Sequence, residues 1–496
     1  MRIFHPTAVE VPLKTRPQAT RSSIQARALP DIEAAPGRRQ VYSLAKGAGT
    51  MRSDPEGLPE EFADRFTRPL RRFLKIESAA GVLLMVATVL ALVISNSPLA
   101  HPVSTFWEKP AGFHLGNLEF TRSLRRWVND ALMTLFFFVA ALELKRELVS
   151  GSLRKAAFPM AGAFGGMLLP PAIYAAMLRG APGAQGWGTA ISTDTAFVLG
   201  GLALLGTRVP VSLRLFILSL AVVDDVGAIL IVALIYGGPL SWPALAVAGG
   251  VVTLVFVFAR IGFRSVPLYI LAGGVLWFAV NASGVHPTLA GVLLGLMTSA
   301  REWVSGVSLH RILERVVGSH ATAAHSRNDG ERKELRMAAI AAKEAISPVE
   351  RIELRLHPWS AFLIMPIFAL ANAGVQLSWA KLVHPVSVAV ATALVVGKPI
   401  GVLAMCWLAE RARIATRPAD LSWPLIAGAS ILTGIGFTMS IFIAGLAFDA
   451  MTLDAAKAGI LSAAVVSGSA GLASLFFLTT RRRPKPKPVH AGAAPS

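Results

Sequence analysis

The chain has 496 residues, of which 54% are hydrophobic and only 16% are charged, and its formal net charge is +19. A soluble protein carries about 25% charged residues, so we expect a polytopic membrane protein. The positive charge does not indicate a nucleic-acid partner, because it lies in loops and tails without a nucleic-acid-binding signature. The single cysteine, Cys406, excludes an internal disulfide and a cysteine-rich metal site.

The two ends of the chain are polar. Residues 1–73 are rich in Arg, Pro, Ser and Ala and lack a sustained period, which predicts a disordered cytoplasmic extension. We assign residues 74–480 to a transmembrane domain and residues 481–496 to a basic cytoplasmic tail. The domain includes a charged cytoplasmic loop at 300–356, whose second half forms either a surface helix or a solvated connector. The mixed charges favour the connector.

Apolar stretches near the bilayer-spanning length of about 20 residues recur along the domain. They predict an all-α membrane protein of about twelve transmembrane helices, at 76–96, 124–147, 157–178, 186–206, 212–236, 243–260, 266–280, 285–299, 358–376, 386–409, 423–448 and 456–479.

The basic residues between these stretches predict their orientation. One side of the membrane receives Lys145, Arg146, Arg154, Lys155, Arg208, Arg260, Arg264, Arg411, Arg413, Arg417 and ten Lys or Arg between Arg301 and Arg355. The other side has few, apart from the group Arg122, Arg125 and Arg126 at the start of the second stretch. Basic loops stay in the cytoplasm, so we expect both termini there.

Two adjacent aspartates, Asp224 and Asp225, lie in the middle of the fifth stretch. Each carboxylate at mid-membrane costs about 2.5–3.5 kcal/mol on insertion scales, which makes the pair a candidate functional site. Two carboxyl groups this close titrate as a coupled pair. Because a helix has ~3.6 residues per turn, their side chains point about 100° apart. One can therefore face a cation while the other faces a neighbouring helix.

Polar residues also interrupt three other stretches. The fourth contains Asp194 between Thr193 and Thr195, and the tenth contains Lys398, which stays charged inside a membrane if a carboxylate pairs with it. The eleventh contains Gly and Thr residues at 433–440. They indicate either an interrupted helix that lines a cavity or close packing of helices through small residues.

The third to fifth and the tenth to twelfth stretches form two trios that cross the membrane in opposite directions, each with its polar interruption in the middle stretch. This inverted repeat predicts two discontinuous helices that cross at mid-membrane. It is a known layout of secondary transporters, among them the family that the motifs below resemble.

Several motifs share their order and spacing with one family of secondary transporters. They are W-V-N-D-A-L-M at 127–133, L-E-L-K-R-E-L at 142–148, S-T-D-T-A-F at 192–197, V-V-D-D-V-G-A-I at 222–229, G-V-H-P-T-L-A-G at 284–291, H-P-W at 357–359, A-N-A-G-V at 371–375, G-K-P-I-G at 397–401 and G-I-G-F-T-M-S-I-F-I at 434–443. Over about residues 70–480 the chain resembles the NhaA family of bacterial sodium/proton antiporters.

The resemblance implies roles for the charged residues. Asp225 would be the principal ligand of Na⁺ and the proton carrier, with Asp224 beside it and paired with Lys398. Thr193 would offer a further oxygen. Asp194 and Lys398 would neutralise the end charges of the two interrupted helices, a need that follows from the helix dipole.

The resemblance also implies an electrogenic exchange of two entering protons for one leaving Na⁺ or Li⁺, which maintains pH and sodium levels. The protein would be a multi-pass protein of the bacterial inner membrane, surrounded by lipid and assembled as a homodimer. It would need no cofactor beyond the transported ions.

A further group of residues marks the family's cytoplasmic pH-responsive funnel, although these residues are equally explained as interfacial charge. The group consists of Glu143, Arg146, Glu147, Glu353 and His357. Leu354 stands where the family pattern predicts a second histidine, which puts the midpoint of the pH response in doubt. His286, beside a helix turn, is either structural or a gating residue.

A sodium-coupled symporter of organic anions with a similar crossed-helix fold is the alternative function. Lys398 would then bind a substrate carboxylate. Two central carboxylates with one lysine favour the antiporter, because they already form a cation site that exchanges protons. An enzyme is not indicated, because the sequence shows no nucleophile–base or metal-ligand arrangement.

Overall fold

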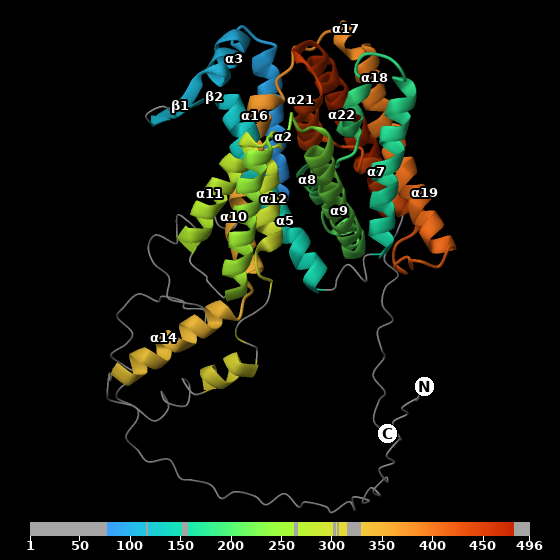
Figure 1. The fold of residues 1–496 in the computed structure, drawn as a ribbon. Helices are drawn as coiled ribbons and strands as arrows, with labels where there is room; N and C mark the ends of the chain where they lie inside the picture. Colours follow the sequence, from blue (N-terminus) through green and yellow to red (C-terminus); the bar gives the residue numbers. More distant parts are fainter. Residues whose placement is uncertain are drawn as a thin grey trace, which may run out of the picture. The chain divides into compact units, whose positions relative to one another are not determined.

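The structure is a computed structural model, and it describes residues 77–115, 118–150, 157–261, 266–300, 304, 307–314 and 329–480. The predicted extension at 1–73 and the predicted tail at 481–496 lie outside these residues. The described part is a helical membrane fold with one antiparallel hairpin of strands β1 (Pro110–Leu115) and β2 (Leu118–Ser123), in which Pro110 pairs with Ser123 (Figure 1).

The helices are α2 (Glu77–Ser95), α3 (Ala100–Glu108), α4 (Leu124–Trp127), α5 (Met133–Ser150), α7 (Ala157–Met177), α8 (Thr195–Leu204), α9 (Val211–Ile235), α10 (Trp242–Ile261), α11 (Val266–Ala282), α12 (Thr288–Met297), α14 (Asp329–Glu344), α15 (Pro348–Trp359), α16 (Met365–Asn372), α17 (Trp379–Leu382), α18 (Pro385–Thr392), α19 (Lys398–Arg411), α20 (Trp423–Leu432), α21 (Phe437–Ala447) and α22 (Ala450–Thr480). Three short π-helices are η1 (Val128–Leu132), η4 (Ser360–Ile364) and η5 (Ala393–Gly397), and two 3-10 helices are η2 (Ala184–Ala190) and η3 (Gly206–Arg208).

Each predicted apolar stretch contains helix, so the polytopic all-α fold is confirmed. Within the described residues, seven helical segments are long and apolar enough to cross a membrane, or up to nine if each sharply bent pair is one span. Three further apolar helices, at Thr195–Leu204, Pro267–Ala282 and Thr288–Met297, fall below the length needed to cross alone. The total of about twelve spans therefore stays a prediction.

The middle helices of the fold are held by a close contact between the third and tenth predicted stretches. Figure 1 shows α7 and α19 side by side, and they pack along one another. A Cβ atom on Gly165 would lie 1.9 Å from the carbonyl oxygen of Gly401, and one on Gly401 would lie 2.2 Å from that of Gly165. The two backbones touch here because neither residue has a side chain.

Two connections differ from the expectation. α3 and the β1–β2 hairpin lie between the first two predicted spans, where the sequence predicts no element. In the 300–356 loop, residues 329–344 form α14 rather than a solvated connector, because Ala, Glu, Lys and Arg are strong helix formers. Ser347 then caps α15, accepting a hydrogen bond from the backbone N–H of Glu350 at 3.3 Å.

Candidate cation site where two interrupted helices meet

The fourth and eleventh stretches are both broken helices, as predicted. Residues 191–194 leave helical geometry between η2 and α8, and residues 433–436 do so between α20 and α21, which meet at a bend of 46°. The two breaks lie against each other, because the backbone N–H of Asp194 donates to the carbonyl oxygen of Ile435 at 2.7 Å. The helix at 433–440 is therefore interrupted, and its small residues also pack closely, since a Cβ atom on Gly434 would lie 2.6 Å from the carbonyl oxygen of Leu394.

Asp194 caps the N-termini of two helices at once. Its Oδ1 accepts from the backbone N–H of Phe197 in α8 at 3.1 Å. Its Oδ2 accepts from the backbone N–H of Thr438 in α21 at 3.0 Å and from the Thr438 hydroxyl at 2.6 Å. One buried carboxylate thus lies at the positive ends of both interrupted helices.

Lys398 lies at the opposite kind of helix end. Its side chain is fully buried, and its Nζ is 2.9 Å from Oδ2 of Asp224. The same Nζ donates to the carbonyl oxygen of Ile191, the residue that caps the C-terminus of η2. The negative charge of Asp194 thus lies at positive helix N-termini, and the positive charge of Lys398 lies at a negative helix C-terminus. Both positions fit the predicted compensation of the helix dipoles. That role stays a prediction.

Asp224 and Asp225 face different surroundings, as their position on α9 predicts. Asp224 is fully buried, and its Oδ2 also accepts from the Thr193 hydroxyl at 2.7 Å. That hydroxyl is 3.0 Å from the carbonyl oxygen of Thr433 and has one hydrogen to share between the two acceptors. Oδ1 of Asp224 has no hydrogen-bond partner among the described residues. A buried, unpaired carboxylate oxygen calls for a cation, a proton or a water.

Asp225 is only half-buried and accepts a hydrogen bond from the Ser192 hydroxyl at 3.2 Å. It borders a cavity of about 50 Å³. Apart from Asp225 and Glu143, the cavity is lined by Ala140, Ala141, Leu144, Val222, Val226, Ile229, Leu230, Val292 and Leu296. A cavity needs at least about 10–15 Å³ of such space to hold one water molecule, so this cavity has room for water or for a partly dehydrated ion.

The sequence did not single out Ser192 or the Thr433 carbonyl as parts of the site. Ser192 directly precedes the Thr193–Asp194–Thr195 run, so its neighbourhood was a usable signal. A main-chain carbonyl such as that of Thr433 has no sequence signature, because any residue supplies one.

The predicted pH-responsive residues come together only in part. Arg146 of α5 donates to Glu353 of α15 at 2.6 Å and lies 3.9 Å from Glu147. Glu353 is 5% exposed, and its Oε2 has no hydrogen-bond partner in the described part of the chain. Glu143 borders the Asp225 cavity instead. His357 is exposed, and no hydrogen bond or ion pair joins it to the described members of the group.

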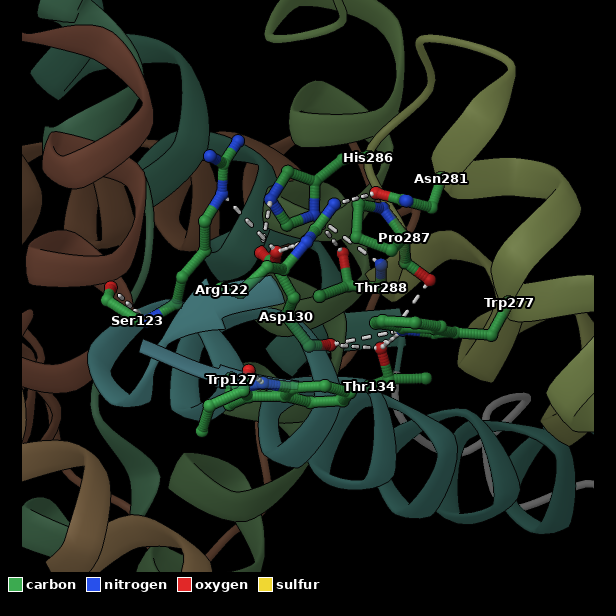
Figure 2. A network of polar contacts seen from close by, with 12 residues as sticks. Arg122, Ser123, Trp127, Asp130, Thr134, Trp277, Asn281, His286, Pro287 and Thr288 are labelled. Atoms are coloured by element: carbon green, nitrogen blue, oxygen red, sulfur yellow. Dashed lines mark hydrogen bonds and ion pairs between the residues drawn. The ribbon is translucent and has the colours of Figure 1, made fainter. Parts of the chain in front are cut away.

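A second polar cluster, which the sequence did not predict, surrounds Asp130 in the π-helix η1 (Figure 2). Arg122 of β2 forms an ion pair with Asp130 and donates to Oδ1 of Asn281 at 2.6 Å. Arg126 and His286 also face Asp130, at 3.8 Å and 3.9 Å. Arg122 and Arg126 lie on the side of the membrane where the sequence predicts few basic residues, and both interact with the buried carboxylate of Asp130. The available signal was Asp130 itself, an acidic residue inside an apolar stretch.

Two interrupted helices crossing beside buried carboxylates, a small cavity and a buried lysine define a secondary active transporter for cations. The sequence identifies the family of this transporter. The model of the Na⁺/H⁺ antiporter 1 family matches residues 71–475, and the chain belongs to that family.

Several relatives are close over most of the chain. The Na⁺/H⁺ antiporter NhaA of Rhizobium meliloti (strain 1021) is 52% identical over 429 residues, which cover 86% of this chain and 98% of the relative. NhaA 1 of Acidiphilium cryptum (strain JF-5) is 50% identical over 428 residues, covering 86% and 95%. NhaA 2 of Vibrio vulnificus (strain CMCP6) is 46% identical over 431 residues, covering 86% and 96%.

Proposed function

We propose that this protein is an antiporter that exchanges internal Na⁺ or Li⁺ for external protons. Its relatives carry the name Na⁺/H⁺ antiporter. The observation that supports the exchange most directly is the pair of adjacent carboxylates: Asp224 is buried with one unpaired oxygen, and Asp225 borders a small cavity.

Asp225 is the proposed carrier of the cation and the proton. Its carboxylate borders the cavity, so an ion in the cavity can reach it, and Ser192 offers a second oxygen. Na⁺ and Li⁺ are hard cations and prefer oxygen ligands. A carboxylate that takes up a proton loses the charge that attracts a cation, so protons and Na⁺ compete for the same atoms. This competition couples the two fluxes.

Asp224 and Lys398 form the proposed coupled neighbour of that site. Their ion pair is completely buried, so any change in the charge of Asp225 acts on it through a medium that screens charges weakly. We assign one of two released protons to Asp225 and the other to the Asp224–Lys398 pair, so that binding of one cation would make the exchange electrogenic.

Organic-anion symport, the alternative function, is not supported by the family. The site also argues against it. Lys398 is held by Asp224 and by the Ile191 carbonyl, which leaves it no place for a substrate carboxylate. A cavity that binds benzene measures about 150 Å³, three times the volume beside Asp225.

The setting of the protein is part of the proposal. We place the chain in the bacterial inner membrane with both termini in the cytoplasm, because the basic loops lie on one side. On this topology the cavity beside Asp225 extends toward the cytoplasmic ends of α5 and α12, where Leu144 and Leu296 border it. A homodimer in lipid and no cofactor beyond the transported ions complete the proposal.

The test is a pH-gradient assay in everted vesicles that contain the full chain. Adding NaCl or LiCl should collapse the gradient over part of the range from weakly acidic to alkaline pH, whereas KCl should not. Asp225→Asn should abolish the response, and Asp449→Asn, at an exposed helix start, should keep it. If neither NaCl nor LiCl collapses the gradient at any pH, the antiporter proposal is wrong. Retained exchange in Asp225→Asn would show that the carrier lies elsewhere.

A further inference from the structure

A buried serine hydroxyl of α22 has no hydrogen-bond partner. Ser467 is fully buried, and its Oγ has no partner among the described residues. Other hydroxyls of α22 donate to carbonyl oxygens of their own helix: Ser462 to Gly459 at 2.9 Å, Ser469 to Val465 at 2.7 Å and Thr479 to Leu475 at 2.7 Å. An unpaired buried donor costs free energy, so this hydroxyl is a candidate for a contact made in another state of the protein.

The π-helix η5 supplies an unpaired acceptor. In an α-helix the carbonyl of Leu394 would accept from the N–H of Lys398, but that N–H donates to the carbonyl of Ala393 instead. In the π pattern the donor to Leu394 would be residue 399. This residue is Pro399, which has no N–H. The Leu394 carbonyl therefore has no donor within its own helix.

The hydroxyl and the carbonyl meet at the break between α20 and α21. A Cβ atom on Gly434 would lie 2.4 Å from Oγ of Ser467 and 2.6 Å from the carbonyl oxygen of Leu394. Both groups therefore lie against the same bare face of Gly434, where they are not hydrogen-bonded to each other. Because both are so close to one point, a small displacement would join the donor to the acceptor.

The elements that carry the two groups are held together, whereas the break beside them is a bend. α18, which leads into η5, touches α22, because a Cβ atom on Gly459 would lie 2.4 Å from the carbonyl oxygen of Ser387. α20 also packs against α22. Beyond the break, α21 is tied to the crossing of the interrupted helices instead. A change of the bend therefore displaces Gly434 relative to Ser467 and Leu394.

The same break borders the candidate cation site. The carbonyl of Thr433, the residue before the glycine, is 3.0 Å from the Thr193 hydroxyl, which also lies 2.7 Å from Oδ2 of Asp224. Leu394 lies about one helical turn before Lys398, the partner of that carboxylate. A change of the bend is therefore felt on both sides of the Asp224–Lys398 pair.

We propose that the Ser467 hydroxyl and the Leu394 carbonyl form a hydrogen bond in a second state of the exchange cycle, which makes Ser467 a positioning residue for the crossing. This inference rests on the proposed antiport, which needs a state open to each side of the membrane. The bond is open in the state seen in the structure, whose cavity extends toward the cytoplasmic ends of α5 and α12. Forming it stabilises the state that opens outward.

The test measures from which side of the membrane the cavity beside Asp225 is reached. Val226 borders this cavity, so Val226→Cys serves as a reporter in the full-length protein, and protein without it gives the background of the buried Cys406. In right-side-out vesicles, a membrane-impermeant maleimide reaches the reporter only in the outward-open state. Adding Ser467→Ala should lower this labelling rate about fivefold, the effect of losing one neutral hydrogen bond. In everted vesicles the rate should change little, because the other state is the major one.

The matched control is Ser462→Ala in the same reporter background. The Ser462 hydroxyl lies on the same helix but donates to the carbonyl of Gly459, so labelling from outside should keep its rate. Either an unchanged rate in Ser467→Ala or an equal fall in Ser462→Ala would overturn the proposal. Labelling does not require exchange, so a protein that fails the antiport assay still gives a result here.

A second variant tests whether Ser467 acts through the Leu394 carbonyl. Pro399→Ala restores a backbone N–H that can donate to this carbonyl in the π pattern, so the acceptor is satisfied in both states. In the Pro399→Ala background, Ser467→Ala should lower labelling from outside only about twofold or less, because the two changes share one partner and are not additive. An equal fall with and without Pro399→Ala would show that the hydroxyl acts on another group, and it would refute the proposed bond.

Discussion

The carboxylate of Asp194 accepts two hydrogen bonds from Thr438, which lies 244 residues later in the chain. Through this contact each interrupted helix depends on the other, because the same carboxylate also caps α8. The Asp194 carboxylate thus adds to the direct backbone contact of the two breaks, in which the Asp194 N–H donates to the Ile435 carbonyl oxygen.

Asp194→Asn should weaken the crossing. The amide has no charge, and its NH₂ group would face the donors of Phe197 or Thr438 in place of a carboxylate oxygen. We expect the free energy of unfolding to fall by about 1.5–3 kcal/mol, the range for hydrogen bonds to a charged group, together with a loss of exchange. Thr438→Val removes only the hydroxyl contact and keeps the backbone N–H, so it should have a smaller effect. Thermal unfolding in detergent measures both. Equal stability of Asp194→Asn and the unmodified protein would contradict the double cap.

Lys398→Met should destabilise the protein strongly, because it leaves Asp224 charged and buried without its partner. The loss of one member of a buried pair amounts to about 3–5 kcal/mol. Adding Asp224→Asn should recover much of this stability without restoring exchange. Lys381→Met, at the partly exposed pair with Asp454, should change stability by about 1 kcal/mol or less. A double variant as unstable as Lys398→Met would show that Asp224 is not the group that needs Lys398.

How far the sequence could anticipate this site depends on the kind of group. Charged residues in apolar stretches are conspicuous, so Asp194, Asp224, Asp225 and Lys398 were predictable, and the structure brings all four to the crossing region. Ser192 was not, because a serine inside a membrane helix is ordinary until the fold places it beside Asp225. The Thr433 carbonyl was not predictable either, because it faces Thr193 only where the helix is interrupted.

The fold shows the same division. The length of apolar runs predicted α9 and α10 closely, since bilayer thickness fixes helix length. The β1–β2 hairpin was not predictable, because two strands alone are marginal in water and this hairpin depends on docking. One such contact is the indole N–H of Trp127, which donates to the Ala111 carbonyl at 2.8 Å.

Ser192→Ala should raise the Na⁺ concentration that gives half-maximal exchange and leave the maximal rate nearly unchanged. A neutral hydrogen bond is worth about 1 kcal/mol, which corresponds to about a fivefold change. Ser430→Ala is the matched control, because its hydroxyl is also buried but donates to its own helix at Ile426. The measurement is the NaCl dependence of the vesicle assay at fixed pH. Equal effects of the two variants would remove Ser192 from the site.

Arg146→Ala should displace the pH profile of exchange toward alkaline pH. Without the guanidinium the ionised form of Glu353 loses its partner at 2.6 Å, so the carboxyl keeps its proton to higher pH. A displacement of about one pH unit corresponds to about 1.4 kcal/mol of lost interaction. His357→Ala should leave the profile in place, because His357 is exposed and forms no described ion pair or side-chain hydrogen bond with Arg146 or Glu353. Profiles recorded at saturating NaCl decide between these outcomes.

The contact of Gly165 with Gly401 limits how the protein can change shape. Because the two backbones meet without intervening side chains, α7 and α19 cannot slide past each other without a clash. The pair therefore behaves as a rigid strut, and Lys398, three residues before Gly401, keeps a fixed reach toward the crossing. Any rearrangement that exposes Asp225 to the other side of the membrane should therefore move α7 and α19 as one unit, with Lys398 carried along.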